Sequence, residues 1–204
     1  MQYLEFREQL KYFVVFSLDD IRKIETPFHR QRLNEWQKKG YIKKVINEYY
    51  IFSDLEINEQ ILFIIANKIF DPSYISTESA LSFYGMIPEG VYSVTSVTSR
   101  KTYVFKSSLA QFSYRKIRPE LIFGYKLVRH KEHVFKMAEI EKALLDYFYF
   151  NSKIKTEGQF AELRINKDAF ERIDLKKLEN YLIQFDNKAM EKRVNKFIKF
   201  MRHA

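Results

Sequence analysis

The chain of 204 residues contains no cysteine, which excludes a disulfide framework and a thiolate metal site. It has only five glycines and none of them are grouped, so the sequence has no glycine-rich phosphate-binding loop. The longest apolar run, Ile61 to Ala66, falls far short of the ~20 residues that a membrane span requires. No secretory signal pattern opens the sequence, and we expect a cytoplasmic protein that does not enter a membrane.

Signatures of catalysis are also missing. There is no nucleophile elbow, and His130 and His133 have no further histidine or acid-rich neighbourhood in the sequence to complete a metal set. Glu139 and Glu141 begin a predicted helix, where the helix dipole stabilises acids without any catalytic role. We interpret Asp146 as a hydrogen-bonded structural acid. We therefore expect no enzyme activity, no metal and no cofactor.

The positive charge, by contrast, is abundant and unevenly distributed. The net charge is +9 at pH 7. Residues 97–131 hold nine Lys or Arg and one Glu, and residues 28–44 hold six and one, whereas residues 54–96 hold six acids and one Lys. Two basic segments separated by an acidic one favour a polyanion as partner. A lysine-rich surface without a partner is the alternative.

Residues 1–53 are predicted to form a winged helix-turn-helix domain. Ser17 is the expected N-cap of the second helix, Thr26 and Pro27 the N-cap and first position of the third, and Gly40 its end. A hairpin turn is expected at Asn47 and Glu48. Helical spacing and β-type runs place the three helices and the hairpin at residues 3–13, 17–25, 26–40 and 41–52.

The third predicted helix is the candidate reader of DNA. Its inner face carries Leu33 and Trp36, and His29 is expected to turn inward as well. On the outer face, the Glu35 carboxylate would be repelled by the phosphates of DNA. Gln and Asn side chains can form two hydrogen bonds with one adenine, and an Arg side chain can do the same with guanine. The lysines of the hairpin would contact phosphate groups. An ordinary solvated helix is the alternative. The candidate DNA-contacting residues of this domain are Thr26, Phe28, Arg30, Gln31, Arg32, Asn34, Lys38, Lys43 and Lys44.

Residues 54–204 are predicted to form an α+β domain, so that the fold class of the whole chain is α+β. Ser76 or Thr77 is expected to cap a helix that stops at Gly85. Five β-type runs between Val91 and Met137 predict a central antiparallel-type sheet. The remaining predicted helices are a connecting helix at residues 54–70 and C-terminal helices near residues 138–150, 175–185 and 188–201.

The stretch Val91 to Phe105, VYSVTSVTSRKTYVF, combines hydroxyl side chains with a basic turn. Strand alternation predicts hydroxyl groups presented on one side of the strand and valines packed on the other. Arg100 and Lys101 would place cations at the rim of the sheet, where a phosphate backbone could lie. Arg115 and Lys116 would join them if their strand is a neighbour. A merely polar turn is the alternative.

Four motifs between Tyr74 and Phe150 resemble the central block of the AbiEi antitoxin family, predicted transcriptional regulators of bacterial abortive-infection loci. They occur in order and at compatible spacings, as YIS-ESALS-YG-IPE, VTS-T-RKT--F, FSYR-I-PEL-FGY and EKALLDY. The order of domains, with the winged helix-turn-helix first, is similar as well. The resemblance implies a mixed α+β antitoxin domain in the second part of the chain.

The resemblance further implies a dual role in phage defence. Such proteins repress their own toxin–antitoxin operon by binding inverted repeats of double-stranded operator DNA, and they counter a nucleotidyltransferase-type toxin. In these type IV systems the two proteins need not form a stable complex. Family members use the N-terminal helix and wing together with a basic face of the second domain, which here corresponds to Arg100, Lys101, Arg115 and Lys116.

Two points stay open at the level of the sequence. The protein would act as a monomer on half-sites or as a pair on DNA. The family often has a basic, glycine-containing wing, whereas this chain has Glu48 at the tip, which argues against DNA contact by the tip itself. The alternative function is an antitoxin that acts mainly by direct contact with the toxin, with DNA binding secondary.

Overall fold

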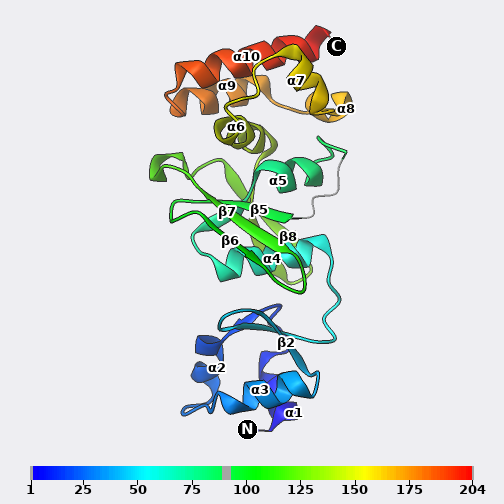
Figure 1. Cartoon of the computed structure of the whole chain (residues 1–204), viewed down its shortest axis with the longest axis vertical. Helices are drawn as coiled ribbons and strands as arrows, with labels where there is room; N and C mark the ends of the chain where they lie inside the picture. Colours follow the sequence, from blue (N-terminus) through cyan, green and yellow to red (C-terminus); the bar gives the residue numbers. More distant parts are fainter. Residues whose placement is uncertain (1, 89–92, 204) are drawn as a thin grey trace.

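The computed structural model describes residues 2–88 and 93–203 as a mixed α+β protein, elongated along one axis (Figure 1). An N-terminal unit (residues 2–53) forms one end, a six-stranded sheet occupies the middle, and the C-terminal helices form the other end. The α+β class expected from the sequence is confirmed. Within the described residues, none of the helices has both the length and the apolar composition needed to cross a bilayer.

The N-terminal unit packs three helices against a three-stranded antiparallel sheet with strand order β1-β3-β2. Its interior is aromatic, with Phe6 against Phe16 and Trp36. The hairpin turn lies at Asn47 and Glu48 as predicted, and Glu48 adopts a positive φ of 67°. The elements are α1 (Tyr3–Leu10), β1 (Phe16–Ser17), α2 (Leu18–Ile24), α3 (Gln31–Lys38), β2 (Ile42–Ile46) and β3 (Tyr49–Phe52).

Ser17 caps α2, as predicted, in a reciprocal capping box. The Ser17 hydroxyl accepts a hydrogen bond from the Asp20 backbone N–H at 3.0 Å, and the Asp20 carboxylate accepts one from the Ser17 backbone N–H at 2.9 Å. Together these two bonds satisfy donors that the first turn of a helix otherwise leaves free.

Replacing Ser17 with alanine is expected to lower the free energy of unfolding by about 1 kcal/mol, because the Asp20 N–H loses its acceptor. Urea unfolding measures the change, with Ser152→Ala as the matched control, since Ser152 is exposed and lies outside any helix. Equal losses in the two variants would contradict the capping role.

The start of α3 differs from the sequence prediction. The helix begins at Gln31 rather than after Thr26, and Pro27 lies outside it. The Thr26 hydroxyl donates to the Arg22 carbonyl at 2.6 Å, so it satisfies the end of α2 instead of capping α3. Gly40 ends the α3 segment with a φ of +72°, as predicted.

The second unit is built on a sheet with strand order β6-β7-β5-β4-β9-β8. The sheet is mixed and not of the expected antiparallel type, because β5 pairs with β7, and β4 with β9, in parallel. β6 forms an edge hairpin with β7, so the chain reverses twice and β7 enters beside β5 in the same direction. The elements are α4 (Glu59–Ile69), β4 (Ser73–Ile75), α5 (Thr77–Phe83), β5 (Ser93–Thr98), β6 (Tyr103–Lys106), β7 (Gln111–Lys116), the 3-10 helix η1 (Pro119–Leu121), β8 (Tyr125–His130) and β9 (His133–Ala138).

Several local predictions for this unit can be compared with the structure. Ser76 is the N-cap residue of α5, although its side chain makes no capping bond, and the helix ends before Gly85, which has a φ of +67°. The connecting helix starts at Glu59, capped by Asn58, and not at residue 54. Two predicted strand residues, 91 and 92, lie outside the described residues.

Helices cover both faces of the sheet. The Tyr114 hydroxyl donates to the Ala66 carbonyl of α4 at 2.9 Å, whereas the adjacent Arg115 donates to the Phe150 carbonyl at the end of α6 at 3.3 Å. Successive side chains of a strand point to opposite faces, so α4 and α6 lie on opposite sides of the sheet (Figure 1).

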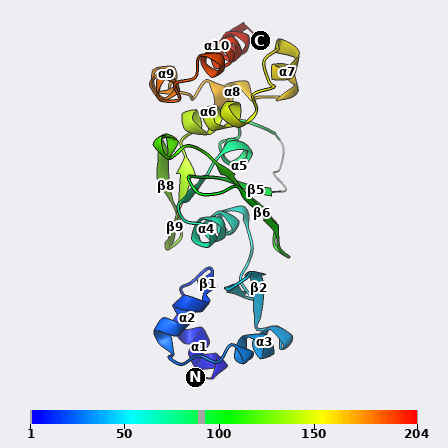
Figure 2. The ribbon, with the colours of Figure 1, turned by 60° about the vertical axis from the view of Figure 1, so that its left-hand side comes forward.

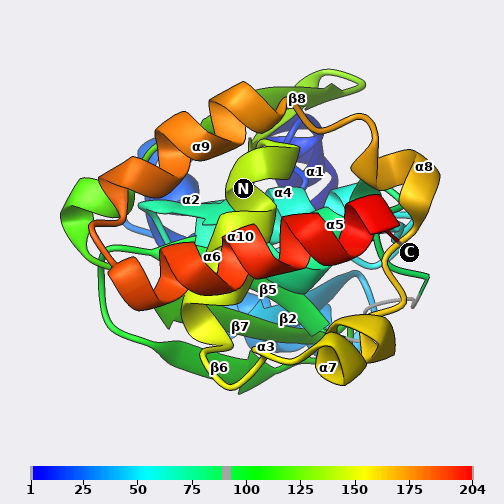
Figure 3. The same ribbon diagram turned by 90° about the horizontal axis from the view of Figure 1, so that it is seen from above.

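The C-terminal helices stack on α6 (Figure 3). α6, α9 and α10 confirm the predicted helices, while two short ones, α7 and α8, were not predicted. α10 buries Met190, Val194, Phe197 and Met201 along one stripe. The bounds are α6 (Ile140–Phe150), α7 (Glu157–Glu162), α8 (Lys167–Phe170), α9 (Leu175–Gln184) and α10 (Lys188–His203).

The β2–β3 hairpin joins the two units. Ile42 and Phe52 pack into the aromatic interior of the N-terminal unit. Val45 and Ile51, on the same two strands, belong instead to the larger apolar core that includes Ile65 of α4. Apolar contacts on both faces of one hairpin therefore fix the N-terminal unit against α4.

Candidate nucleic-acid interface

The outer face of α3 presents hydrogen-bonding side chains to solvent. Leu33 and Trp36 are buried, as predicted, and hold the helix on the N-terminal unit. Gln31, Asn34 and Lys38 are exposed on the other side. Amides of this kind form paired hydrogen bonds with adenine in the major groove. Glu35 is exposed as well, so the face carries one opposing charge.

Two residues just before α3 were placed wrongly by helical projection. Phe28, predicted on the reading face, is half-buried with its ring centroid 6.1 Å from that of Trp36. His29, predicted to turn inward, is exposed. Projection fails for both residues because the chain is not helical before Gln31. Phe28 therefore belongs to the packing of α3, and the Thr26 hydroxyl is engaged with the end of α2.

The two arginines flanking α3 are engaged with acids. Both carboxylate oxygens of Glu25 accept hydrogen bonds from Arg32, at 2.8 and 2.9 Å. Arg30 lies 3.6 Å from Glu48, and both of these side chains are about half exposed. Both bonds come from the Nη1 atom of Arg32, so the pair holds Arg32 against the residues before α3, and Arg30, which is more exposed and lies farther from its acid, is the more available cation.

The hairpin supplies two lysines whose charges are not neutralised. Lys43 and Lys44 are exposed on β2. Their ammonium groups donate to neutral acceptors, the Ser53 carbonyl at 3.3 Å and the Asn47 side chain at 3.4 Å. Both keep the charge and the reach that a phosphate contact requires.

Cations of the second unit lie at the ends of neighbouring strands. β5 and β7 are adjacent, as assumed, with Thr98 opposite Lys116. Lys101 and Lys116 are exposed, and within the described part of the chain neither has an acidic partner within 4.0 Å. Arg100 is exposed too, although it donates to the Asp71 carbonyl at 3.0 Å and lies over the Phe70 ring.

Arg115 does not belong to this basic rim, contrary to the sequence prediction. Its guanidinium lies 4.2 Å from the centre of the Phe150 ring and 3.9 Å from the Glu78 carboxylate. Strand alternation turns it to the α6 face while Lys116 turns to the opposite one. Arg115 therefore holds the end of α6 to the sheet.

The hydroxyls of β5 are also structural and are not presented to solvent. The Thr95 hydroxyl donates to the Ser76 carbonyl at 2.9 Å and accepts from the Ser79 backbone N–H at 3.0 Å. The Thr98 hydroxyl donates to the Pro72 carbonyl at 2.7 Å. These bonds tie β5 to the start of α5 and to the residue before β4, which explains the two threonines of the strand; the Ser93 and Ser96 hydroxyls are buried and have no hydrogen-bond partner among the described residues.

The elements α3 and β2 lie on the same side of the molecule as the β6 edge of the six-stranded sheet. In Figure 2, α3, β2 and β6 all lie on the right-hand side, and Figure 3 places them on the same side when the molecule is seen from above. The β6 edge of the second unit therefore lies on the same side as α3 and β2 of the N-terminal unit. Because DNA carries a charge every ~1.7 Å of helix axis, one duplex running along this side could meet both.

Sequence reasoning missed a fully buried ion pair inside the second unit. Lys142 and Asp146, one turn apart on α6, both have completely buried side chains. The Asp146 carboxylate also accepts from the Tyr74 and Ser76 hydroxyls, at 2.9 and 2.8 Å, which confirms it as a hydrogen-bonded acid. Burial raises the pKa of Asp146 and lowers the pKa of Lys142, because both charged forms lose their hydration. A Lys and an Asp four residues apart in the apolar stretch EKALLDYF were the available signal.

The other acids and histidines considered above take structural positions. His130 and His133 face each other across β8 and β9. Glu139 accepts a hydrogen bond from the Tyr181 hydroxyl at 2.6 Å and pairs with Lys177 at 2.9 Å, so it fixes α9 to the start of α6. In the described ranges, no three acids or histidines come close enough together to hold a metal ion.

Two comparisons with known proteins were negative. No protein-family model matches the chain. No curated protein matches it either. The similarity of four motifs to the AbiEi family therefore stays a hypothesis, and functional assignment depends on the geometry of the chain's own residues.

Proposed function

We propose that the N-terminal unit is a winged helix-turn-helix and that it binds double-stranded DNA. The observation that carries the proposal is the outer face of α3, which exposes Gln31, Asn34 and Lys38 directly opposite its buried Leu33 and Trp36. The order of helices and strands, with a basic hairpin after α3, supports the same assignment. In this arrangement α3 enters the major groove and β2 contacts the adjacent phosphates.

The same duplex would continue along the second unit. Arg100, Lys101 and Lys116 are exposed near the ends of β5 and β7, in the half of the sheet whose edge strand is β6, and Figure 2 shows β6 on the side of the molecule that carries α3 and β2. Contacts of lysine and arginine with phosphate add affinity and orientation without reading sequence. This assigns base recognition to the N-terminal unit and additional backbone contact to the second one.

The biological role follows from the motif resemblance. We propose an AbiEi-type antitoxin that acts in the cytoplasm, represses its own abortive-infection operon at inverted repeats, and opposes a nucleotidyltransferase-type toxin. A winged helix joined rigidly to an α+β unit suits both tasks, because the first reads DNA and the second remains available for another function. The proposal includes no catalytic residue and no cofactor.

Binding to the promoter upstream of the chain's own gene tests the DNA-binding part. Footprinting is expected to protect inverted repeats, and the affinity for this DNA should exceed that for a scrambled duplex. Replacing Gln31 and Asn34 together with alanine should remove most of that preference, since each lost paired contact to a base costs about 1–3 kcal/mol. Fluorescence anisotropy at fixed salt measures both affinities.

The matched control is Asn180→Ala, which removes an exposed amide from α9 at the far end of the molecule. This variant should keep the promoter preference unchanged. Equal affinity of the unaltered protein for promoter and scrambled DNA would refute sequence recognition by α3. If the Gln31/Asn34 variant still prefers promoter DNA over scrambled DNA, another surface of the protein recognises the sequence.

A further inference from the structure

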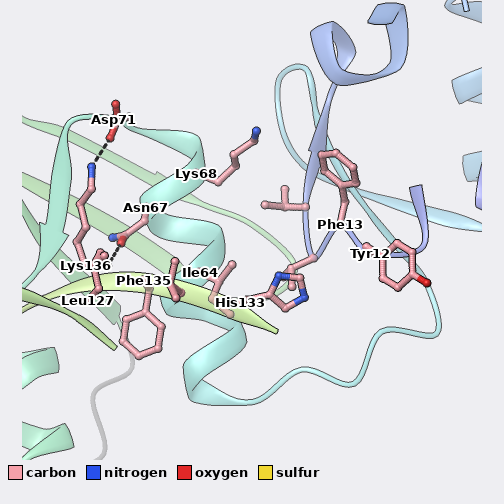
Figure 4. Close-up of a pocket in the computed structure, with 13 residues that line it drawn as sticks. Tyr12, Phe13, Ile64, Asn67, Lys68, Asp71, Leu127, His133, Phe135 and Lys136 are labelled. Atoms are coloured by element: carbon pink, nitrogen blue, oxygen red, sulfur yellow. Dashed lines mark hydrogen bonds and ion pairs between the residues drawn. The ribbon is translucent and has the colours of Figure 1, made fainter. Parts of the chain in front are cut away.

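Exposed apolar side chains gather around one groove between the N-terminal unit and the β8–β9 hairpin (Figure 4). The side chains of Tyr12, Leu127 and Val134 are 65%, 66% and 51% exposed, and Phe13 is 39% exposed. All four line a cavity of about 410 Å³. They come from two chain segments that are far apart in sequence, the loop before β1 and the β8–β9 hairpin.

The floor of the groove is apolar and its polar groups are mostly satisfied. Ile64 of α4 and Phe135 of β9 form part of the floor. The Asn67 Oδ1 atom accepts a hydrogen bond from the Lys136 backbone N–H at 2.5 Å, whereas its Nδ2 atom has no partner among the described residues. Large side chains that stay in solvent around an apolar depression are typical of a surface that binds another protein.

The cations inside the groove are neutralised by neighbouring acids. Lys68 lies 3.3 Å from the Asp20 carboxylate, and Lys136 lies 2.9 Å from that of Asp71. A ligand that enters the groove therefore meets little net charge at its floor.

The rim, in contrast, is positive. Arg129 lies opposite Val134 in the strand register, and Lys131 lines an adjoining cavity together with Phe13. Both are exposed, and in residues 2–88 and 93–203 neither has an acid within 4.0 Å. Glu132, between them in sequence, is the acid of this turn. A ligand that combines apolar anchors with negative charge would complement both the groove and its rim.

The free edge of β8 adds backbone hydrogen-bonding groups beside the groove. Among the described strands, β8 pairs with β9 alone and ends the sheet. Leu127 belongs to β8 and also lines the groove. Extended peptides use such edges by adding a strand, with alternate side chains placed in neighbouring pockets.

A second copy of the chain does not fit this surface. Pairing two β8 edges would bring the cations Arg129 and Lys131 of both copies into one interface without acids to match them, and like charges brought together in an interface are unfavourable. The groove also lies on the side of the molecule away from α3, since β8 and β9 are on the left in Figure 2 and α3 is on the right. Two copies joined there would turn their α3 helices in opposite directions.

We propose that this groove binds an extended segment of a partner protein that carries large apolar and acidic residues two positions apart, on one face of the segment, because Leu127 and Arg129 are themselves two positions apart on β8 and share a face. The apolar side chains enter the space between Phe13, Leu127 and Val134, and the acids pair with Arg129 and Lys131. This site goes beyond DNA binding and does not depend on it. Because β8 and β9 lie on the side of the molecule away from α3, a segment bound there leaves the outer face of α3 open.

Short synthetic peptides test the proposal with the full-length protein. A fluorescent peptide that repeats Leu-Ser-Glu-Ser (the Leu–Glu peptide) should bind at least about tenfold more tightly than one that repeats Leu-Ser-Lys-Ser, or Ser-Ser-Glu-Ser, a difference of about 1.4 kcal/mol. Replacing Leu127 and Val134 with serine should reduce that affinity about tenfold or more. Replacing Arg129 and Lys131 with glutamate should reverse the preference between the Glu and Lys peptides.

Two controls separate the groove from general surface effects. Ile183→Ser removes an apolar side chain that is 75% exposed on α9, and Lys192→Glu reverses a charge on α10. Both variants should bind the Leu–Glu peptide as the unaltered protein does. All variants change exposed residues, and unchanged thermal unfolding confirms that they are folded.

Three outcomes would overturn the proposal. They are no binding of any peptide, equal binding of all three peptides, or binding that is unchanged in the Leu127/Val134 variant. Concentration-dependent dimerisation that this variant abolishes would assign the groove to a second copy instead. Promoter affinity, measured in parallel, should be the same in all groove variants, so failure of this inference and failure of the DNA-binding proposal give different results.

Discussion

Replacing Asp146 with alanine is expected to lower the free energy of unfolding by roughly 3–5 kcal/mol, the largest stability effect of any single change considered. The side chain of its partner, Lys142, is completely buried, so loss of Asp146 leaves an ammonium group in the core without an opposing charge. The Tyr74 and Ser76 hydroxyls lose their acceptor in the same change. A domain of this size is stable by only about 5–15 kcal/mol, and the variant would be close to unfolding.

The surroundings of Lys142 explain why the pair must be kept or removed as a unit. The ammonium group lies 5.0 Å from the ring centres of both Phe123 and Phe185. It also donates to the Tyr74 hydroxyl at 2.9 Å. Removing both charges with Lys142→Met and Asp146→Leu is therefore expected to restore most of the lost stability, since apolar groups need no partner in this site.

Urea unfolding measures this coupling. The variants compared are Asp146→Ala, the single variants Lys142→Met and Asp146→Leu, and the double variant that combines the last two. Asp168→Ala is the control for loss of a carboxylate, because Asp168 is exposed on α8. A loss below about 1 kcal/mol for Asp146→Ala, in the range of an exposed ion pair, would be incompatible with a buried pair. A double variant less stable than either single one would mean that the hydrogen bonds to Tyr74 and Ser76 matter more than the charges.

Local signals predicted the N-terminal unit well. Ser17 as a cap, Gly40 as a stop and a turn at Asn47 each depend on neighbouring backbone groups, which the sequence displays directly. The prediction of where α3 starts was wrong for a related reason. A threonine hydroxyl can bond the carbonyl of the helix before it as readily as the N–H of the helix after it, and Thr26 makes the first of these bonds.

In the second unit, the pairing of the strands and the exposure of the cations depend on packing between distant parts of the chain, and the sequence did not predict them. Alternation and β-branched residues identified the strands, but pairing β5 with β7 in parallel depends on where the β6 hairpin places them. Arg115 and Lys116 are neighbours of equal charge, yet α6 covers one of them and leaves the other in solvent. Position in the sequence could not tell a structural cation from a candidate phosphate contact.

The affinity of the protein for its promoter is expected to fall about a thousandfold between ~50 and ~200 mM salt. The expectation comes from the exposed cations of α3, of β2 and of the ends of β5 and β7, and neutralising about six phosphates gives a log–log slope of about −5. The slope measures the number of phosphate contacts independently of the bases that are read. The cations counted are Lys38, Lys43, Lys44, Arg100, Lys101 and Lys116.

The salt dependence of variants shows how much each group of cations contributes to the slope. Replacing Lys101 and Lys116 with alanine should make the slope less steep by about 2 and weaken promoter and scrambled DNA equally, because phosphate contacts carry no sequence information. Replacing Arg129 and Lys131, exposed cations on the opposite side, should leave the slope unchanged. If both pairs reduce it equally, the protein attracts DNA through its net charge of +9 and not through an aligned surface. If only the second pair reduces it, DNA lies along β8, and α3 faces away from the duplex.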